Sequence, residues 1–208
     1  IQALEGGGFE VRCAGGTQLR ARRVVCATSG PDSAAYLGRL APAEARMLDA
    51  VPYAALAVVH LAAPRAAPVI PGGFGVLFPD GGAARMLGVM FNSELFPGLA
   101  PSDRRLLTVC LGGVGAEAVC GWSDGRIIDA ARGELKERLG VSGLEPLGIR
   151  RWARAIPQYN VGHFKLCAAL AALERRFPGL VFVGADQGGV AVPDRVRFAI
   201  QKVETCLG

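Results

Sequence analysis

The sequence contains few of the residues that build the commonest metal and acid–base sites. Among its 208 residues it has 2 histidines and 2 tryptophans, and its only lysines are Lys136, Lys165 and Lys202. Its 6 cysteines are widely spaced and never occur as Cys-x-x-Cys, so no zinc-binding pattern is present. We therefore expect no metal site, and reduced thiols that behave as small apolar side chains.

Long hydrophobic runs are also missing from the sequence. The longest, around residues 53–63, contains His60 and falls short of the roughly 18 residues that a membrane-spanning helix needs. The sequence opens at Ile1 without the basic and apolar residues of a secretory leader. A cytoplasmic location is therefore expected.

The net charge of +5 is carried almost wholly by arginine. The arginines are scattered, with short clusters at 20–23 and 150–154, and they form no cationic stripe with interleaved aromatic residues. We therefore expect no nucleic-acid partner. The mildly basic surface favours a carboxylate-bearing substrate, or peripheral contact with anionic lipid on the inner face of the cell membrane. The sequence leaves a homodimer open.

The apolar pattern predicts an α/β chain with an antiparallel middle. Strands are predicted at 9–13 and 19–27, the second passing from a sheet edge to a buried parallel position. Helices follow from Pro31 and over 42–50. The middle holds strands at 53–62, 105–111 and 145–156, and a hairpin of 74–78 and 85–91 with its turn at 80–82. Helices at 124–139, 163–177 and 193–206 and a strand at 180–184 complete the prediction.

One glycine-rich segment matches the residue pattern of a dinucleotide-binding fingerprint but lacks its expected structural context. Residues 113–118 read Gly-Val-Gly-Ala-Glu-Ala after a predicted strand. A true fingerprint opens a long helix inside a βαβ unit, whereas a short segment ending at Gly121-Trp122 precedes the next helix here. We therefore interpret this segment as a turn. The glycine loop that binds a diphosphate is missing from the sequence.

A second glycine-containing segment, near the C-terminus, offers backbone donors that could bind an anionic group. A strand ending at Gly184, then Gly188-Gly189, and a helix from about Pro193 leave backbone N–H groups at a helix start, where negative charge is favoured. The residues alone leave two interpretations open. The segment is either an ordinary strand–loop–helix connection, or the place where the negatively charged edge of a reduced flavin is bound.

Several short motifs follow one another in order along the chain. Upstream they are 73–79 (GFGVLFP), 87–98 (LGV followed by FNSELFPG), 106–108 (LLT) and 112–113 (GG). Nearer the C-terminus they are Ile156-Pro157-Gln158-Tyr159, Gly162-His163, Pro178-Gly179-Leu180 and Gly188-Gly189-Val190-Ala191-Val192-Pro193-Asp194. Taken together, these motifs resemble the protoporphyrinogen oxidase family, within the flavin-containing amine oxidase superfamily, and the similarity covers nearly the whole sequence.

The resemblance implies an α/β fold in which a partial FAD-binding, Rossmann-like domain carries an inserted antiparallel or mixed-sheet α+β substrate domain. The implied division is 1–50 for part of the FAD-binding domain, 51–177 for the substrate-binding domain, and 178–208 for the return to the FAD-binding domain. Because the segment that binds ADP is missing, this chain by itself is expected to bind FAD weakly or not at all.

The activity implied is oxidation of protoporphyrinogen IX to protoporphyrin IX in haem synthesis, with non-covalent FAD and with oxygen as acceptor. Residues matching the family's terminal flavin motif are Gly184, Gly189, Val190, Ala191 and Val192. No catalytic residue follows from the resemblance. The alternatives are another amine-oxidase-like flavoprotein, such as a carotenoid desaturase, and a non-catalytic module that binds porphyrin or a partner.

Three further side chains are candidates for the neighbourhood of substrate or flavin. Arg151 and Arg154 could reach substrate propionates, because a guanidinium matches a carboxylate as a fork. His163 opens a predicted helix after Gly162, and we interpret it as a structural residue rather than a base.

Overall fold

Two parallel strands, distant in sequence, form the centre of one of the two units into which the chain divides. The computed structural model describes residues 1–68, 73–78 and 86–207. The first unit comprises Ile1–Pro52 and the chain from Pro157 onward, and the second comprises Tyr53–Ile156. In the first unit, β4 (Val24–Cys26) pairs in parallel with β10 (Leu180–Phe182). All three residues of β10 are buried, as continuous apolar strands of parallel sheets usually are.

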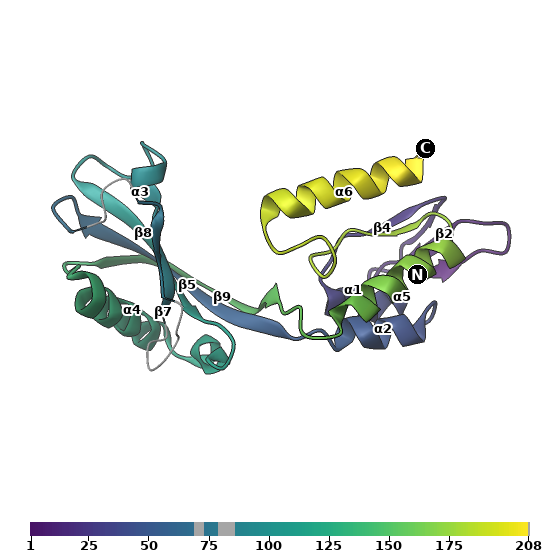
Figure 1. Ribbon diagram of the computed structural model, residues 1–208, viewed down its shortest axis with the longest axis horizontal. Coiled ribbons are helices and arrows are strands. Elements are labelled where there is room, and N and C mark those ends of the chain that lie inside the picture. The colour runs from purple at the N-terminus through teal and green to yellow at the C-terminus, as the bar shows by residue number, and fades with distance from the viewer. Residues whose placement is uncertain (69–72, 79–85, 208) are drawn as a thin grey trace. The chain divides into compact units, whose positions relative to one another are not determined.

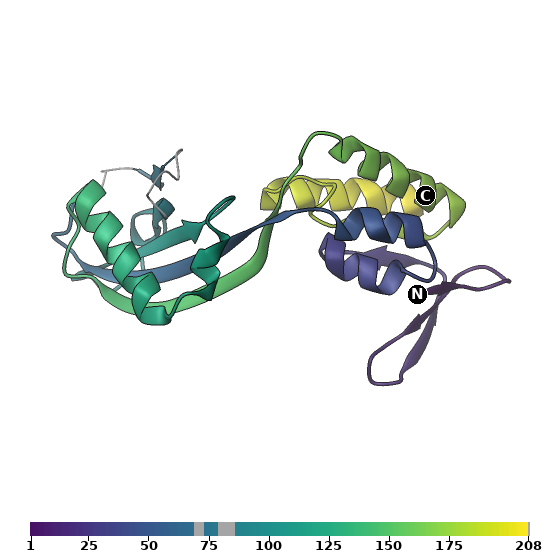
Figure 2. The same ribbon diagram turned by 90° about the horizontal axis from the view of Figure 1, so that it is seen from below.

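Four helices surround this strand pair in the first unit (Figures 1 and 2). They are α1 (Gly30–Leu37), α2 (Pro42–Asp49), α5 (His163–Arg176) and α6 (Val192–Leu207). Ser29 caps α1, since its hydroxyl accepts from the N–H of Asp32, and a proline stands in the first turn of both α1 and α2. Helix α5 buries Leu166, Leu170 and Leu173.

A small antiparallel sheet of β1 (Gln2–Ala3), β2 (Phe9–Arg12) and β3 (Gln18–Ala21) extends from the first unit, dark purple in Figure 2. The predicted single strand at 19–27 is therefore wrong. It is split at Arg22-Arg23 into β3, which pairs with β2, and β4, which pairs with β10. Two consecutive arginines oppose a continuous path into a buried strand, because burying their charges without partners is costly.

The described residues of the second unit form a five-stranded sheet in the order β6-β7-β8-β5-β9, together with short and long helices. Its strands are β5 (Tyr53–Pro64), β6 (Gly75–Leu77), β7 (Met86–Phe91), β8 (Arg104–Gly112) and β9 (Glu145–Pro157). The pairs β5–β8, β7–β8 and β6–β7 are antiparallel, which confirms the predicted hairpin. Its predicted turn at 80–82 lies outside the described residues, as do residues 69–72 of the connection before it.

Helix α4 (Asp124–Leu139) lies along one face of this sheet (Figure 2). Its side chains Ile127, Ala131 and Leu135 are fully buried among Ala57, Val59 and Leu61 of β5. Both predicted ends of α4 are confirmed: the Ser123 hydroxyl accepts from the N–H of Arg126, and Gly140 closes the helix with a φ of 67°. The short α3 (Asn92–Leu95) connects β7 to β8, and the 3-10 helix η1 (Glu117–Gly121) connects β8 to α4.

The arrangement confirms an α/β chain with an antiparallel insertion. The compact second unit comprises Tyr53–Ile156. Helix α5 belongs to the first unit, where its leucines are buried and the helix packs on α2 and β10.

Candidate functional site

The loop between β10 and α6 requires glycine at three places. A Cβ on the buried Gly184 would lie 2.7 Å from the carbonyl oxygen of Thr28, just beyond β4. A Cβ on Gly188 would lie 2.8 Å from the ring of Phe198 in α6, and Gly189 has a φ of 90°. The loop is therefore shaped by close backbone approach and by a left-handed residue. Two of these glycines, Gly184 and Gly189, are predicted cofactor residues.

The start of α6 presents both apolar surface and unpaired backbone donors. The N–H of Arg195 donates to the carbonyl of Ala191 at 3.1 Å, which is the first hydrogen bond of the helix, so the N–H groups before it have no acceptor within the helix. Val190 and Val192 are exposed hydrophobic side chains, 39% and 71% accessible. The positive end of the helix dipole thus lies beside an open apolar surface.

Two aromatic rings hold the loop in place from the segment before α5. The hydroxyl of Tyr159 donates to the carbonyl of Ala185, and Nε2 of His163 lies 2.6 Å from the carbonyl of Asp186. Because a carbonyl only accepts, Nε2 of His163 carries a proton. Burial raises the pKa of the Tyr159 hydroxyl, although the N–H of Gly189 opposes the shift, so this hydroxyl stays a neutral donor.

The predicted structural role of His163 agrees with this geometry. The residue opens α5, and its Nε2 bonds to the backbone of the loop between β10 and α6. Gly162, with a φ of 92°, precedes it and turns the chain into the helix. We call Tyr159, His163 and the two carbonyls of 185–186 the loop clamp.

Sequence reasoning did not identify Asp186. Its side chain is 2% exposed, and its Oδ1 lies 3.0 Å from where a Cβ on Gly30 would stand. Gly30 begins α1, so a carboxylate lies at the N-terminus of this helix, where the dipole favours it. Asp186 thereby joins the loop to the β4–α1 connection.

A triangle of hydroxyls at that connection was also not predicted. Thr28 Oγ1 is 2.9 Å from Ser33 Oγ and 2.8 Å from the Tyr36 hydroxyl, and Ser33 Oγ is 2.9 Å from the Tyr36 hydroxyl. Burial raises the pKa of the nearby Cys26 thiol to about 11. This thiol is therefore protonated at neutral pH and unsuited to nucleophilic chemistry.

The two arginines proposed for substrate differ in their surroundings. Nη2 of Arg151 donates to the Trp122 carbonyl at 2.8 Å and to Asp124 Oδ1 at 2.5 Å, so this guanidinium holds β9 to the start of α4. Arg154 is exposed and forms no ion pair with any described residue. Arg154 thus has no ion pair among the described residues, whereas Nη2 of Arg151 already has two acceptors.

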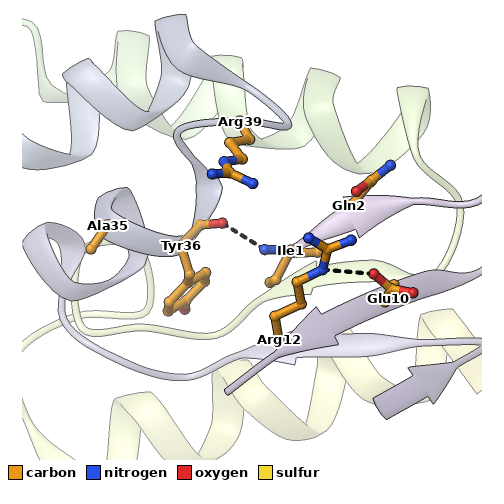
Figure 3. A pocket seen from close by; sticks show the side chains of 7 residues that line it. All are labelled: Ile1, Gln2, Glu10, Arg12, Ala35, Tyr36 and Arg39. Carbon is orange, nitrogen blue, oxygen red and sulfur yellow. Dashed lines mark hydrogen bonds and ion pairs between the residues drawn. The ribbon is translucent and has the colours of Figure 1, made fainter. Parts of the chain in front are cut away.

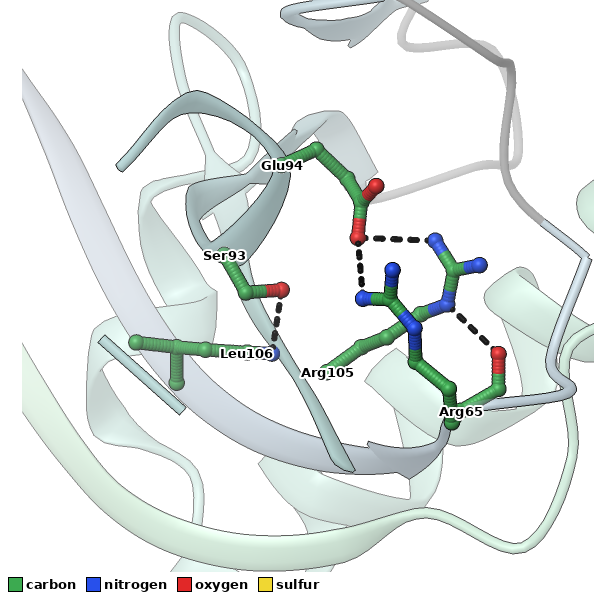
Figure 4. Close-up of polar contacts among 5 residues, drawn as sticks. All are labelled: Arg65, Ser93, Glu94, Arg105 and Leu106. Atoms are coloured by element: carbon green, nitrogen blue, oxygen red, sulfur yellow. Dashed lines mark hydrogen bonds and ion pairs between the residues drawn. The ribbon is translucent and has the colours of Figure 1, made fainter. Parts of the chain in front are cut away.

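A second charged cluster in the same unit consists of one carboxylate and two arginines. Glu94 Oε1 lies 3.2 Å from Nη1 of Arg65 and 2.8 Å from Nη1 of Arg105, while Nε of Arg105 donates to the Arg65 carbonyl (Figure 4). The hydroxyl of Ser93 accepts from the N–H of Leu106. These contacts fix α3 on β8 and make the cluster structural.

Two other features carry none of the predicted site residues. A cavity of about 450 Å³ in the first unit is lined by Arg39 and by the Arg12–Glu10 pair, and the backbone nitrogen of Ile1 bonds there to the Tyr36 carbonyl (Figure 3). The segment 113–118 forms a turn with left-handed glycines and leads into η1, a single 3-10 turn. It opens no long helix, which agrees with its interpretation as a turn.

Among the described helices, none combines the length and the hydropathy needed to cross a membrane.

The sequence match to a protein family assigns this fold and loop to a class of flavoproteins. Residues 1–199 match the family described as flavin containing amine oxidoreductase, and the chain belongs to this family. The FAD cofactor predicted from the sequence is the one that this membership implies.

The most informative relatives are porphyrinogen oxidases. The chain is 30% identical over 216 aligned residues to protoporphyrinogen oxidase 1 of Arabidopsis thaliana, covering 97% of this chain and 40% of the relative. It is 32% identical to coproporphyrinogen III oxidase of Propionibacterium freudenreichii, covering 91% of this chain and 36% of the relative. The chain thus spans less than half the length of these relatives.

Solved structures show the same fold. A protein assigned as a protoporphyrinogen oxidase, from Exiguobacterium, superposes with a TM-score of 0.78 at 22% identity over 98% of this chain and 44% of its own. A putrescine oxidase variant superposes with a TM-score of 0.66 at 16% identity over 99% of this chain and 47% of its own. These likenesses confirm the predicted fold class.

The loop and helix start fit the ring end of FAD. The chain offers apolar side chains at Val190 and Val192, backbone donors at the start of α6, and a glycine at 189 where a left-handed turn is needed. A planar ring with an electron-rich edge needs this combination of apolar contact and N–H donors.

Proposed function

We propose that this chain forms the ring-facing part of the FAD site and the substrate-binding unit of an oxidase that converts protoporphyrinogen IX to protoporphyrin IX with oxygen as acceptor. The observation that carries the proposal is the clamped loop before α6, held by Tyr159 and His163. Porphyrinogen oxidases among the relatives support the substrate class.

Each part of the site has a separate task in this proposal. Gly184 and Gly189 let the loop follow β4 and turn, and Val190, Ala191 and Val192 present the start of α6 to the ring. When bound, FAD would supply the acceptor for successive two-electron steps, and dioxygen would take the electrons and protons to give hydrogen peroxide. The loop clamp keeps the donors of this helix start in a fixed geometry, which costs no reorganisation as the ring becomes negative.

A second candidate substrate is coproporphyrinogen III. The coproporphyrinogen III oxidase of Propionibacterium aligns over 91% of this chain, nearly as much as the plant protoporphyrinogen oxidase. The two substrates share the macrocycle and differ in carboxylate number, so the same site chemistry serves both.

The test is flavin binding followed by turnover. FAD is titrated by absorbance and fluorescence into the 208-residue chain and into a longer polypeptide that contains it and has the length of its relatives. We expect tight binding to the longer polypeptide, followed by oxidation of a porphyrinogen as a rise in porphyrin fluorescence. Turnover of a polyene but of neither porphyrinogen would instead establish the desaturase alternative. Porphyrin binding without flavin binding would establish the non-catalytic module.

We propose further that the first unit contributes to FAD binding and the second to substrate binding. We also propose a cytoplasmic location with peripheral contact to the inner face of the cell membrane, and a homodimer. Vesicle co-sedimentation and light scattering of the longer polypeptide test the last two.

A further inference from the structure

The sheet of the second unit has two faces of different character. On one face, Val59 and Leu61 of β5 belong to the buried core beneath α4. Their neighbours Val58 and His60 project from the opposite face, because successive side chains of a strand alternate. His60 is directly opposite Thr108 of β8, and Nδ1 of His60 lies 2.9 Å from Oγ1 of Thr108. This polar pair is therefore satisfied within the sheet.

Strand β9 continues this opposite face at the sheet edge. Ile149 packs against the core beneath α4, and Arg151 bonds to the start of α4. Arg150, Trp152 and Arg154 alternate with these residues, so they project from the other side of β9. Arg150 and Arg154 are exposed and Trp152 is 49% accessible.

The exposed side chains of β9 form a cation–aromatic–cation row. The guanidinium carbon of Arg150 lies 5.3 Å from the centroid of the Trp152 ring, and Arg154 follows two residues beyond, about 7 Å along the strand. Neither arginine has an ion pair with any residue in 1–68, 73–78 or 86–207. Glu145, the only acidic residue of β9, pairs with Arg104 at 2.9 Å.

Two unpaired guanidiniums beside an exposed indole suit a ligand with a large apolar ring and peripheral carboxylates. A guanidinium binds a carboxylate with two parallel N–H donors, and an indole supplies broad apolar contact at little cost in conformational entropy. Val58 and the half-buried Cys110, paired across β5 and β8, extend the apolar surface of the same face. An anionic lipid surface shares part of this chemistry but does not need a flat sheet face.

We infer that Arg150 and Arg154 bind the propionate carboxylates of the porphyrinogen, and that Trp152 packs against its macrocycle. The inference rests on the proposed function and deepens it, since it replaces Arg151 by Arg150 as the partner of Arg154. Arg151 lies on the other face of β9 and already has two acceptors.

The test compares porphyrins that share a ring and differ in charge. Protoporphyrin IX, coproporphyrin III and their methyl esters are titrated into the polypeptide that contains this chain at the length of its relatives, with binding followed by porphyrin fluorescence. Arg150→Gln and Arg154→Gln should each weaken binding of the free acids about fivefold, as expected for a charge-assisted hydrogen bond at an exposed site, and leave the esters unchanged. Trp152→Ala should weaken acids and esters alike.

Arg20→Gln is the matched control, because Arg20 is an exposed arginine on β3 of the first unit and its loss changes the net charge equally. If Arg150→Gln and Arg154→Gln bind the free acids as Arg20→Gln does, the inference is overturned while turnover of porphyrinogen still supports the proposed function. Loss of ester binding in the arginine variants also overturns it, since this indicates a changed fold. If they reduce only co-sedimentation with phosphatidylglycerol vesicles, the row is a lipid contact. Absence of any porphyrin binding or turnover by the unsubstituted protein overturns the proposed function itself.

Discussion

The ring of Tyr159 stacks on the imidazole of His163, with 4.3 Å between the ring centroids and 18° between their planes. Each ring also bonds to a carbonyl of the loop that leads to α6: Tyr159 to Ala185, and His163 to Asp186. The chain that leads into the first residue of α5 and the loop after β10 are therefore held together at two successive loop residues. The position of the candidate flavin loop depends on this contact.

The first prediction concerns the loop clamp. Tyr159→Phe keeps the stacked ring but leaves the Ala185 carbonyl without its donor, and should lower the free energy of unfolding by about 1 kcal/mol. His163→Phe should do the same at the Asp186 carbonyl. Urea denaturation measures both effects, and the FAD titration of the longer polypeptide should show weaker binding in both variants.

Phe164→Ala is the control for these variants, because Phe164 is adjacent to His163 and 70% exposed. Its effect should stay within about 0.5 kcal/mol. Equal denaturation midpoints for Tyr159→Phe, His163→Phe and this control would show that the clamp does not hold the loop.

A second prediction concerns the left-handed turn of the loop between β10 and α6. Gly189 has a φ of 90°, and a Cβ there would also lie 3.2 Å from Cβ of Asp194. Gly189→Ala should therefore cost about 1–3 kcal/mol, equivalent to roughly 2–4 °C in Tm for each kcal/mol in a chain of this size. Gly15→Ala is the control, since no atom lies within 4 Å of a Cβ there and its φ is not positive. Calorimetry measures the Tm of both variants. An equal Tm for Gly189→Ala and Gly15→Ala would show that the loop accommodates a side chain at residue 189 without strain.

The sequence was most informative where local chemistry determines an element. Helix α4 could be predicted from end to end, because Ser123 and Gly140 supply the side-chain cap and the left-handed stop. The hairpin of β6 and β7 followed from alternation in the same way. Parallel pairing of β4 with β10 was only suggested, since more than 150 residues separate strands whose pairing leaves no local signal.

The candidate site was predictable only in part, because contacts between residues distant in the sequence leave no local signal. Glycines of the loop between β10 and α6 are visible as a motif, but the contacts of Tyr159 and His163 with 185–186 and the approach of Asp186 to Gly30 depend on tertiary placement. Among the arginines, the sequence could not choose between the two faces of β9. That choice follows from Ile149, whose packing beneath α4 places Arg151 on the core side.

A third prediction separates the structural arginine of β9 from the exposed ones. Arg151→Met should destabilise the protein by about 1 kcal/mol, because it removes donors from the Trp122 carbonyl and from Asp124. The Asp124 carboxylate is 70% exposed, so solvent limits the contribution of the ion pair itself. Arg154→Met should leave the denaturation midpoint unchanged.

A double-mutant cycle with Asp124→Asn measures the pairwise contribution of Arg151. We expect a coupling energy below about 1 kcal/mol, with the remaining loss of Arg151→Met due to the Trp122 carbonyl. Equal stability of Arg151→Met and Arg154→Met would contradict the assignment of the two arginines to different faces of β9.

The final prediction concerns the pH dependence contributed by Cys26. Burial raises the pKa of its thiol from 9.0 to about 11 in the folded protein, so the folded state favours the protonated thiol more than the unfolded state does. The corresponding stability is fully present below about pH 9 and is lost as the pH rises through 11, at up to about 1.4 kcal/mol per pH unit. Urea denaturation at pH 8.5 and 10.5 should show this loss in the unsubstituted protein and a smaller one in Cys26→Ala. The neighbouring Tyr36, whose pKa burial also raises, remains in both proteins. Cys13→Ala, at an exposed cysteine, should retain the full pH dependence.

The quantity to compare is the change in the free energy of unfolding between the two pH values, because Cys26→Ala leaves a small cavity at every pH. An identical change in all three proteins would mean that the Cys26 thiol ionises as readily in the folded state as in the unfolded state.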